Sequence, residues 1–125
     1  AIVFFCGTND LTALKTPEET INDFKKFLGL VRNEFGNIKV YIIGIKPTVD
    51  RIYLDEEERI FNSSIKLLAS DDAYLEYINI WDPMLNQDGT RMPELFIEDG
   101  LHMNRKGYEV WTKKVRESLG KDFDL

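Results

Sequence analysis

The only histidine of the sequence stands three residues after an aspartate, in the segment Asp99-Gly-Leu-His102-Met-Asn104. An imidazole titrates near neutral pH, so His102 can take a proton from a nucleophile and return it to a leaving group. Such a base needs a partner on its second ring nitrogen, and a short turn closed by Gly100 would let the Asp99 carboxylate fold back onto Nδ1. A surface histidine beside a helix-capping aspartate gives the same pattern, because short motifs match readily by chance.

A second polar motif, Gly7-Thr8-Asn9-Asp10, directly follows the apolar run at the start of the chain. The side-chain amide of Asn9 could donate a hydrogen bond to an oxyanion that forms in a crevice above the sheet. Ordinary turn chemistry is the alternative interpretation, since glycine, asparagine and aspartate favour the corner between a strand and a loop.

Three apolar runs predict the strands that carry these motifs, at residues 2–6, 39–45 and 77–81. They are rich in β-branched and aromatic residues, and the first is continuously apolar, as in a strand covered on both faces. Three amphipathic stretches predict helices at residues 17–35, 56–69 and 105–119. Thr16 with Glu19 forms a capping box for the first helix, and Asp55 is the expected cap of the second.

The alternation of strands and helices predicts one α/β domain over residues 1–125, with a parallel sheet and helices packed on it. Residues 82–98 form the longest irregular stretch and contain Pro83, Gly89 and Pro93. This stretch is expected to be a long loop at the carboxyl end of the third strand. Active sites of open α/β sheets lie at that end, which is also where both polar motifs fall.

Composition excludes several classes of function. The net charge of −6 opposes a general affinity for nucleic acid, which needs a basic face. Cys6 is the only cysteine, so no intrachain disulfide forms, and one histidine with one cysteine does not make a tetrahedral metal site. We expect no cofactor, no phosphate loop and no transmembrane segment. The chain opens inside an apolar run without the basic region of a signal peptide. Localisation stays open, because a signal peptide would lie in the N-terminal segment that we expect upstream of this chain.

The whole pattern resembles GDSL-type (SGNH) ester hydrolases over nearly the full length of the chain. The resemblance rests on the two polar motifs and their order along the βα units, with Lys46-Pro47 after the second strand and Asn62 in the second helix as further points of similarity. The block Pro93-Glu-Leu-Phe-Ile-Glu-Asp-Gly-Leu-His-Met-Asn-Arg-Lys-Gly-Tyr108 is close to the last conserved block of that family.

The resemblance implies a flavodoxin-like three-layer α/β/α fold and a serine esterase mechanism without metal or cofactor. It assigns His102 as the base, Asp99 as its orienting partner and Asn9 as a donor of the oxyanion hole. The family's nucleophilic serine lies in a GDS motif, and a second oxyanion donor is a glycine of another block. Neither has a counterpart in this sequence. We therefore expect the chain to be the C-terminal portion of a single SGNH domain, with the N-terminal strands missing.

No residue of the chain is a convincing replacement for that serine. Ser63, Ser64 and Ser118 fall within predicted helices, which lack the sharp strand-to-helix turn that exposes a nucleophile. Cys6 ends a buried strand, where a free cysteine is usually a small core hydrophobe, and no adjacent cation is evident to lower its pKa. Trp81, Trp111 and Tyr108 are read as packing residues.

The sequence thus predicts an esterase that acts on a small acyl ester, such as an acetylated sugar or a lipid, with the serine lying upstream. A non-catalytic binding or assembly module with a relic site is the alternative. The first strand, residues 2–6, would lose a neighbour if the upstream segment were absent. An apolar edge without proline or charge favours pairing with another strand, so we expect it to pair with a second chain or an N-terminal fragment.

Overall fold

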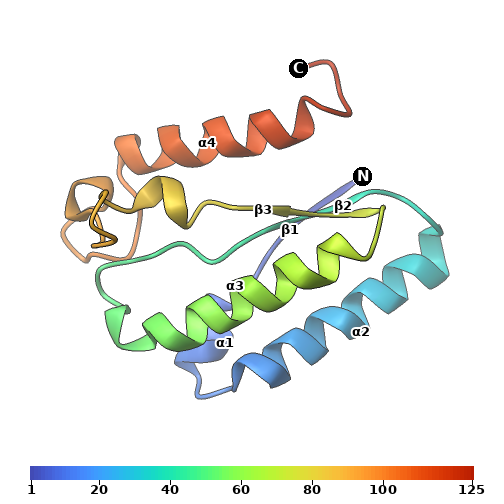
Figure 1. The fold of residues 1–125 in the computed structure, drawn as a ribbon, viewed down its shortest axis with the longest axis horizontal. Coiled ribbons are helices and arrows are strands. Elements are labelled where there is room, and N and C mark those ends of the chain that lie inside the picture. The colour runs from blue at the N-terminus through green and yellow to red at the C-terminus, as the bar shows by residue number, and fades with distance from the viewer.

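The alternating strands and helices fold into three layers, as the sequence predicts. The computed structural model describes residues 1–125 and contains one sheet of three parallel strands, β1 (Ile2–Phe5), β2 (Val40–Ile43) and β3 (Leu75–Ile78), in the order β1-β2-β3. Helices α2 (Pro17–Phe35) and α3 (Asp55–Ser70) cover one face of the sheet, and helix α4 (Arg105–Leu119) covers the other (Figure 1). No helix has the length and apolar character needed to cross a bilayer.

Helices α2 and α4 have the predicted bounds. At α3 the prediction that Asp55 caps the helix is wrong. The Thr16 hydroxyl accepts from the backbone N–H of Glu19, so the predicted capping box is present at α2. At α3 a short 3₁₀ turn, η1 (Ile52–Leu54), runs directly into the helix, and Leu54 occupies the cap position. Asp55 is therefore a residue of the helix itself, and its carboxylate accepts hydrogen bonds from Arg59 and Arg91 instead.

The third strand differs most from its predicted position, because side-chain chemistry ends it early. It occupies Leu75–Ile78 rather than residues 77–81, with Leu75 paired to Val40 of β2. The side-chain oxygen of Asn79 accepts from the backbone N–H groups of Trp81 and Asp82 and so turns the chain out of the sheet.

A short helix that the sequence analysis did not predict follows β1. Residues Thr8–Thr12 form α1, so the Gly-Thr-Asn-Asp motif is the start of a helix rather than a simple turn. Gly7 precedes it with a φ of 113°, and a Cβ at Gly7 would lie 3.0 Å from Ile45 Cδ1. The residue before α1 therefore has to be a glycine for both conformational and steric reasons.

The two faces of β1 are covered to different extents. Phe4 stacks on Phe27 of α2 with ring centroids 4.2 Å apart and belongs to the core between the sheet and α2 and α3. Val3 and Phe5 point to the opposite face, where they remain 47% and 39% exposed. Strand β1 pairs only with β2, so its other edge has no neighbour within the chain.

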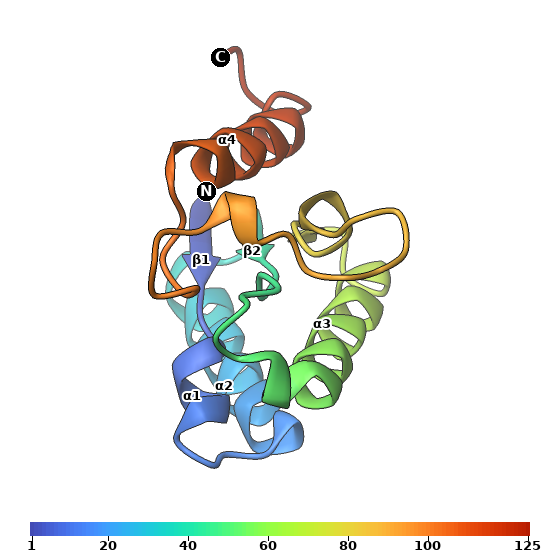
Figure 2. The same cartoon turned by 90° about the vertical axis from the view of Figure 1, so that its left-hand side faces the viewer.

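The carboxyl edge of the sheet gathers segments from the whole length of the chain. Figure 2 looks onto this edge and shows α1, the segment around η1 and the loop that leads to α4 arranged around the ends of the strands. The predicted long loop contains two 3₁₀ turns, η2 (Asp82–Met84) and η3 (Pro93–Leu95). An isolated antiparallel bridge between Phe96 and Met103 closes the loop just before α4.

Candidate active site

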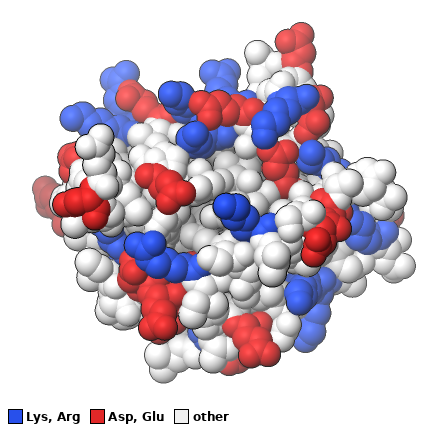
Figure 3. Space-filling model, in the orientation of Figure 1, with Lys and Arg blue, Asp and Glu red and all other residues white.

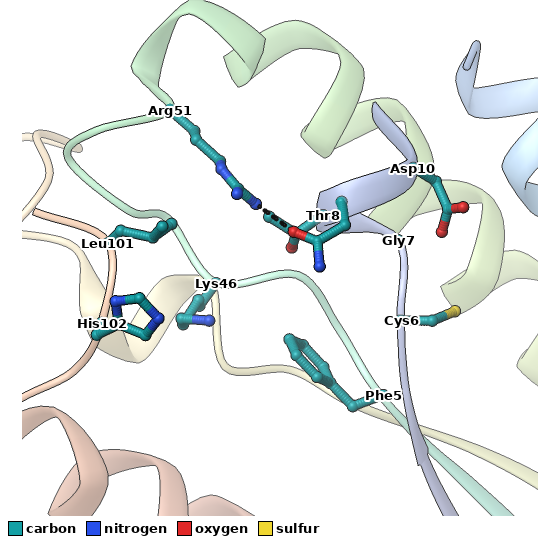
Figure 4. Close-up of a pocket in the computed structure, with 10 residues that line it drawn as sticks. Phe5, Cys6, Gly7, Thr8, Asp10, Lys46, Arg51, Leu101 and His102 are labelled. Carbon is teal, nitrogen blue, oxygen red and sulfur yellow. Dashed lines mark hydrogen bonds between the residues drawn. The ribbon is translucent and has the colours of Figure 1, made fainter. Parts of the chain in front are cut away.

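A cavity of about 370 Å³ opens at the carboxyl edge of the sheet and is lined by residues of both polar motifs. Strand β1 and helix α1 supply one wall, the loop after β2 supplies a second, and the loop before α4 supplies a third (Figure 4). The residues that matter for its chemistry are Phe5, Asn9, Lys46, Arg51, Leu101 and His102. Asn9 and His102, which are far apart in sequence, thus face one space, as the resemblance implied.

Asp99 and His102 form the hydrogen bond that their spacing suggested. His102 Nδ1 lies 2.5 Å from Asp99 Oδ2. The other carboxylate oxygen accepts from the backbone N–H groups of Leu101 at 2.8 Å and of His102 at 2.9 Å. The hydrogen bond from the imidazole and the two from the backbone lower the pKa of Asp99 to about 2, so the carboxylate is ionised at neutral pH.

The turn that carries this pair is fixed at both ends by backbone hydrogen bonds. Ile97 N–H donates to the carbonyl of His102, and Gly100, with a φ of 65°, accepts from the backbone N–H of Asp50. Asn104 then caps α4 by accepting from Gly107 N–H at 3.1 Å. An imidazole bound in this way presents Nε2 as its free proton acceptor, and the ionised aspartate stabilises the imidazolium that would form.

The orientation of the Asn9 amide is set by Arg51. Arg51 Nη1 donates to Asn9 Oδ1 at 3.2 Å, which is the contact drawn as a dashed line in Figure 4. The Asn9 NH₂ group has no acceptor within the chain, so it remains free to donate a hydrogen bond in or beside the cavity. A free amide donor of this kind can stabilise a developing oxyanion.

No serine lines this cavity, and the one cysteine that does is poorly suited to be a nucleophile. Burial, together with the nearby Asp10 and Asp23 carboxylates, raises the pKa of Cys6 to about 11, so the thiol is protonated at neutral pH. Figure 4 also shows the sulfur directed away from His102. Ser63 lines a different cavity, beside Trp81 and Tyr77, which contains no histidine.

An ionic cluster centred on the buried Arg91 side chain holds the loop after β2. Arg91, from the long loop, donates to the Thr48 carbonyl and to the carboxylates of Asp55 at 2.7 Å and Glu58 at 3.2 Å. Glu58 is fully buried, and burial raises its pKa to about 7 against the opposing effect of Arg91. The side chain of Asn62 adds two hydrogen bonds to the backbone of Ile45, so the segment leading to Lys46 is held by side chains on two elements.

The sequence analysis did not identify Lys46 or Arg51 as residues of the site, and it assigned Tyr108 wrongly. Lys46 lies three residues past the last residue of β2, so the rule that places sites at the carboxyl ends of strands could have found it. The position of Arg51 depends on the path of a loop, for which the sequence carries no comparable signal. Tyr108 was expected on the packing face of α4, but it is 51% exposed and stacks on Trp111. Trp81 is buried as expected.

The fold and the cavity define an α/β protein with a histidine–aspartate pair at the carboxyl edge of a parallel sheet. The sequence model of the GDSL-like Lipase/Acylhydrolase family matches residues 1–110, and the chain belongs to this family. No group of three or more histidine, cysteine, aspartate or glutamate side chains is arranged to hold a metal ion.

The proteins that this chain resembles are longer than the chain. A GDSL-like lipase from Bacteroides thetaiotaomicron superimposes with a TM-score of 0.76 at 19% identity, with 97% of this chain and 62% of that protein covered. A carbohydrate esterase of family 3 from Talaromyces cellulolyticus gives a TM-score of 0.68 at 21% identity, with coverage of 98% and 60%. The chain is 26% identical over 117 residues to an N-acylneuraminate cytidylyltransferase from Escherichia coli O18:K1:H7, and it covers 27% of that protein.

Proposed function

We propose that the protein containing this chain is a serine ester hydrolase, with His102 as general base, Asp99 as its orienting partner and Asn9 as an oxyanion donor. The observation that carries the proposal is the 2.5 Å contact between His102 Nδ1 and Asp99 Oδ2 beside a cavity that Asn9 also lines. Family membership supports acyl transfer as the reaction. Residues 1–125 form the C-terminal portion of the catalytic domain in this proposal, and the serine and the second oxyanion donor come from an upstream segment.

In the proposed reaction the serine hydroxyl attacks the ester carbonyl while His102 Nε2 accepts its proton. The Asp99 carboxylate stabilises the imidazolium, and the Asn9 amide donates to the oxyanion of the tetrahedral intermediate. His102 then protonates the leaving alcohol, and water hydrolyses the acyl-serine by the same steps in reverse order. No metal or cofactor is required. The substrate in this proposal is a small acyl ester, such as an acetylated sugar or a lipid, and the similar structures include both a carbohydrate esterase and a GDSL-like lipase.

Hydrolysis of 4-nitrophenyl acetate by the full-length protein tests this assignment. His102→Ala should lower kcat by at least about 10⁴-fold, as expected when a base that acts together with its nucleophile is removed. Asn9→Ala should lower kcat by about 10²- to 10³-fold, the usual effect of losing one oxyanion donor. An Asn9→Ala variant with wild-type kcat would remove Asn9 from the mechanism.

The 125-residue chain by itself should not hydrolyse the same ester, because it contains no suitable nucleophile. Turnover that disappears in the His102→Ala chain would mean that the nucleophile lies within residues 1–125, and Cys6→Ser would then be the variant to examine. If the full-length protein also lacks activity and has no serine beside His102, the alternative of a non-catalytic binding module replaces the esterase.

The open edge of β1 is the proposed attachment point for a further strand, from a second chain or from an N-terminal segment of the same protein. Ile2 N–H donates to Lys39 O, and amide groups alternate in direction along a strand, so the Val3 amide faces the open edge. Hydrogen exchange in the native protein tests the pairing. Slow exchange at Val3, comparable with that of β2, is expected, and exchange at the rate of an unprotected amide would contradict it.

A further inference from the structure

The cavity beside His102 contains two cationic side chains that form no direct ion pair with a carboxylate of the chain. Lys46 and Arg51 both belong to the loop after β2. Figure 4 shows the Lys46 head group beside His102, whereas the Arg51 guanidinium lies at its hydrogen bond with Asn9. No carboxylate oxygen lies within 4.0 Å of either head group, a distance at which Lys15, Lys39 and Arg91 all have acidic partners. The other lysines and arginines without such a partner are all exposed, whereas Lys46 and Arg51 are half-buried in a protein whose net charge is −6.

Both head groups are held in place by contacts that leave their charge available. The Lys46 ammonium lies 5.1 Å from the centroid of the Phe5 ring, and the side chain is half-buried. Arg51 uses Nη1 to bind Asn9 Oδ1 and has no other hydrogen-bond partner in the chain. Burial, followed by the proximity of Arg51, lowers the pKa of Lys46 below its usual value, and the buried Glu58 carboxylate offsets only part of this effect.

The acidic residue that lines the cavity does not provide that compensation. Asp10 lies 3.9 Å from Lys15 Nζ, and Figure 4 shows its carboxylate on the far side of the cavity from Lys46. On the outer surface the situation differs, because basic and acidic side chains are interspersed across the face drawn in Figure 3. The positive charge of the cavity is thus a local property of the candidate site.

We propose that Lys46 and Arg51 form a subsite for an anionic oxygen group of the substrate, a carboxylate or a phosphate, next to His102. The inference rests on the proposed esterase function and narrows its substrates from acyl esters in general to negatively charged esters. The N–H groups of Arg51 that do not bind Asn9 can donate to such a group as a fork, and Lys46 adds a point charge. The anionic group then orients the ester relative to His102 and Asn9.

Equilibrium binding separates this subsite from catalysis. The protein is the full-length His102→Ala variant, and the probes are the mono-4-nitroanilide of succinic acid and the same anilide with its free carboxylate converted to a primary amide. Isothermal titration should give at least about tenfold tighter binding of the charged probe, as expected for hydrogen bonds to a charged group in a partly closed site. Lys46→Met should reduce this preference on the order of tenfold. Lys113→Met, which removes an exposed lysine of α4, is the matched control and should leave the preference unchanged.

Inorganic phosphate is the third probe and distinguishes the two kinds of anion. Phosphate that binds more tightly than the succinic anilide, with a Lys46-dependent affinity, would identify a phosphate-bearing ester. Equal binding of the charged and uncharged anilides, unaffected by Lys46→Met or by the milder Lys46→Gln, would overturn the subsite even if the protein hydrolyses neutral esters. Conversely, charge-selective binding without hydrolysis of any ester by the wild type would retain the subsite and reject the esterase.

Discussion

The Asp99–His102 pair joins residues three positions apart and is largely exposed, whereas Arg91 reaches Glu58 across 33 positions in a place closed to water. The side chains of His102 and Asp99 are 70% and 41% exposed, and those of Arg91 and Glu58 are 5% and 0% exposed. Both pairs hold loops at the carboxyl edge of the sheet. The exposed pair is available for chemistry, and we expect its removal to cost little folding stability. The buried pair stabilises the loop after β2 and cannot lose one partner without leaving the other uncompensated.

The largest effect should come from a change in the Asp99–His102 pair, and it should lower kcat without changing folding stability. Asp99→Asn keeps an oxygen that can accept from the backbone of Leu101 and His102 but removes the charge that stabilises the imidazolium. We expect kcat of the full-length protein for an aryl ester to fall about 10⁴-fold. The midpoint of urea unfolding should stay close to that of the wild type, because exposed pairs contribute little to stability. A variant that unfolds much more easily would show that the turn is structural.

Removal of Arg91 should instead lower folding stability. Arg91→Met leaves Glu58 buried without a cation and frees the Thr48 carbonyl, so we expect the free energy of unfolding to fall by about 3–5 kcal/mol. Arg105→Met is the matched control, since Arg105 forms an exposed pair with Glu109, and it should change stability by no more than about 0.5 kcal/mol. Similar losses in the two variants would mean that burial does not distinguish the pairs.

The double variant Arg91→Met with Glu58→Gln sharpens the same test. If the loss in Arg91→Met comes from the orphaned carboxylate, neutralising Glu58 should restore part of it, and the two changes should not be additive. Strict additivity would assign the loss to the ion pair with Asp55, to the hydrogen bond with Thr48 or to packing against Trp81, whose ring lies 5.1 Å from the Arg91 guanidinium.

The smallest effect is the pH dependence of the free energy of unfolding that Glu58 causes. Glu58 keeps its proton up to about pH 7 in the folded protein, whereas the unfolded chain releases it near its ordinary value of 4.5. The folded state thus binds more protons between these values, so the contribution of Glu58 to the free energy of unfolding falls as pH rises. The wild type should lose about 3 kcal/mol relative to Glu58→Gln between pH 4.5 and 7.5 in urea titrations. Glu109→Gln, at an exposed position, should show no such difference.

The contrast between the pairs also explains which parts of the site the sequence could predict. Asp99 and His102 are close in sequence, and an i, i+3 contact within a turn needs only local geometry. The bounds of α2 and α4 were predictable for the same reason, because caps and helical periodicity act over a few residues. The third strand was misplaced because Asn79 ends the ladder, and α1 was missed because its five residues are too few for a periodic signal.

By itself, the sequence determined the order of strands and helices, the parallel sheet and the candidate roles of His102, Asp99 and Asn9, through local periodicity and motifs that resemble those of a known family. Only the tertiary structure decided that Lys46 and Arg51 share a cavity with His102 and that Arg91 supports their loop from within the core. The physical reason is the range of the interactions. Hydrogen-bonded turns and amphipathic faces are encoded within a few residues, whereas the meeting of distant charges depends on how the loops pack at the carboxyl edge of the sheet.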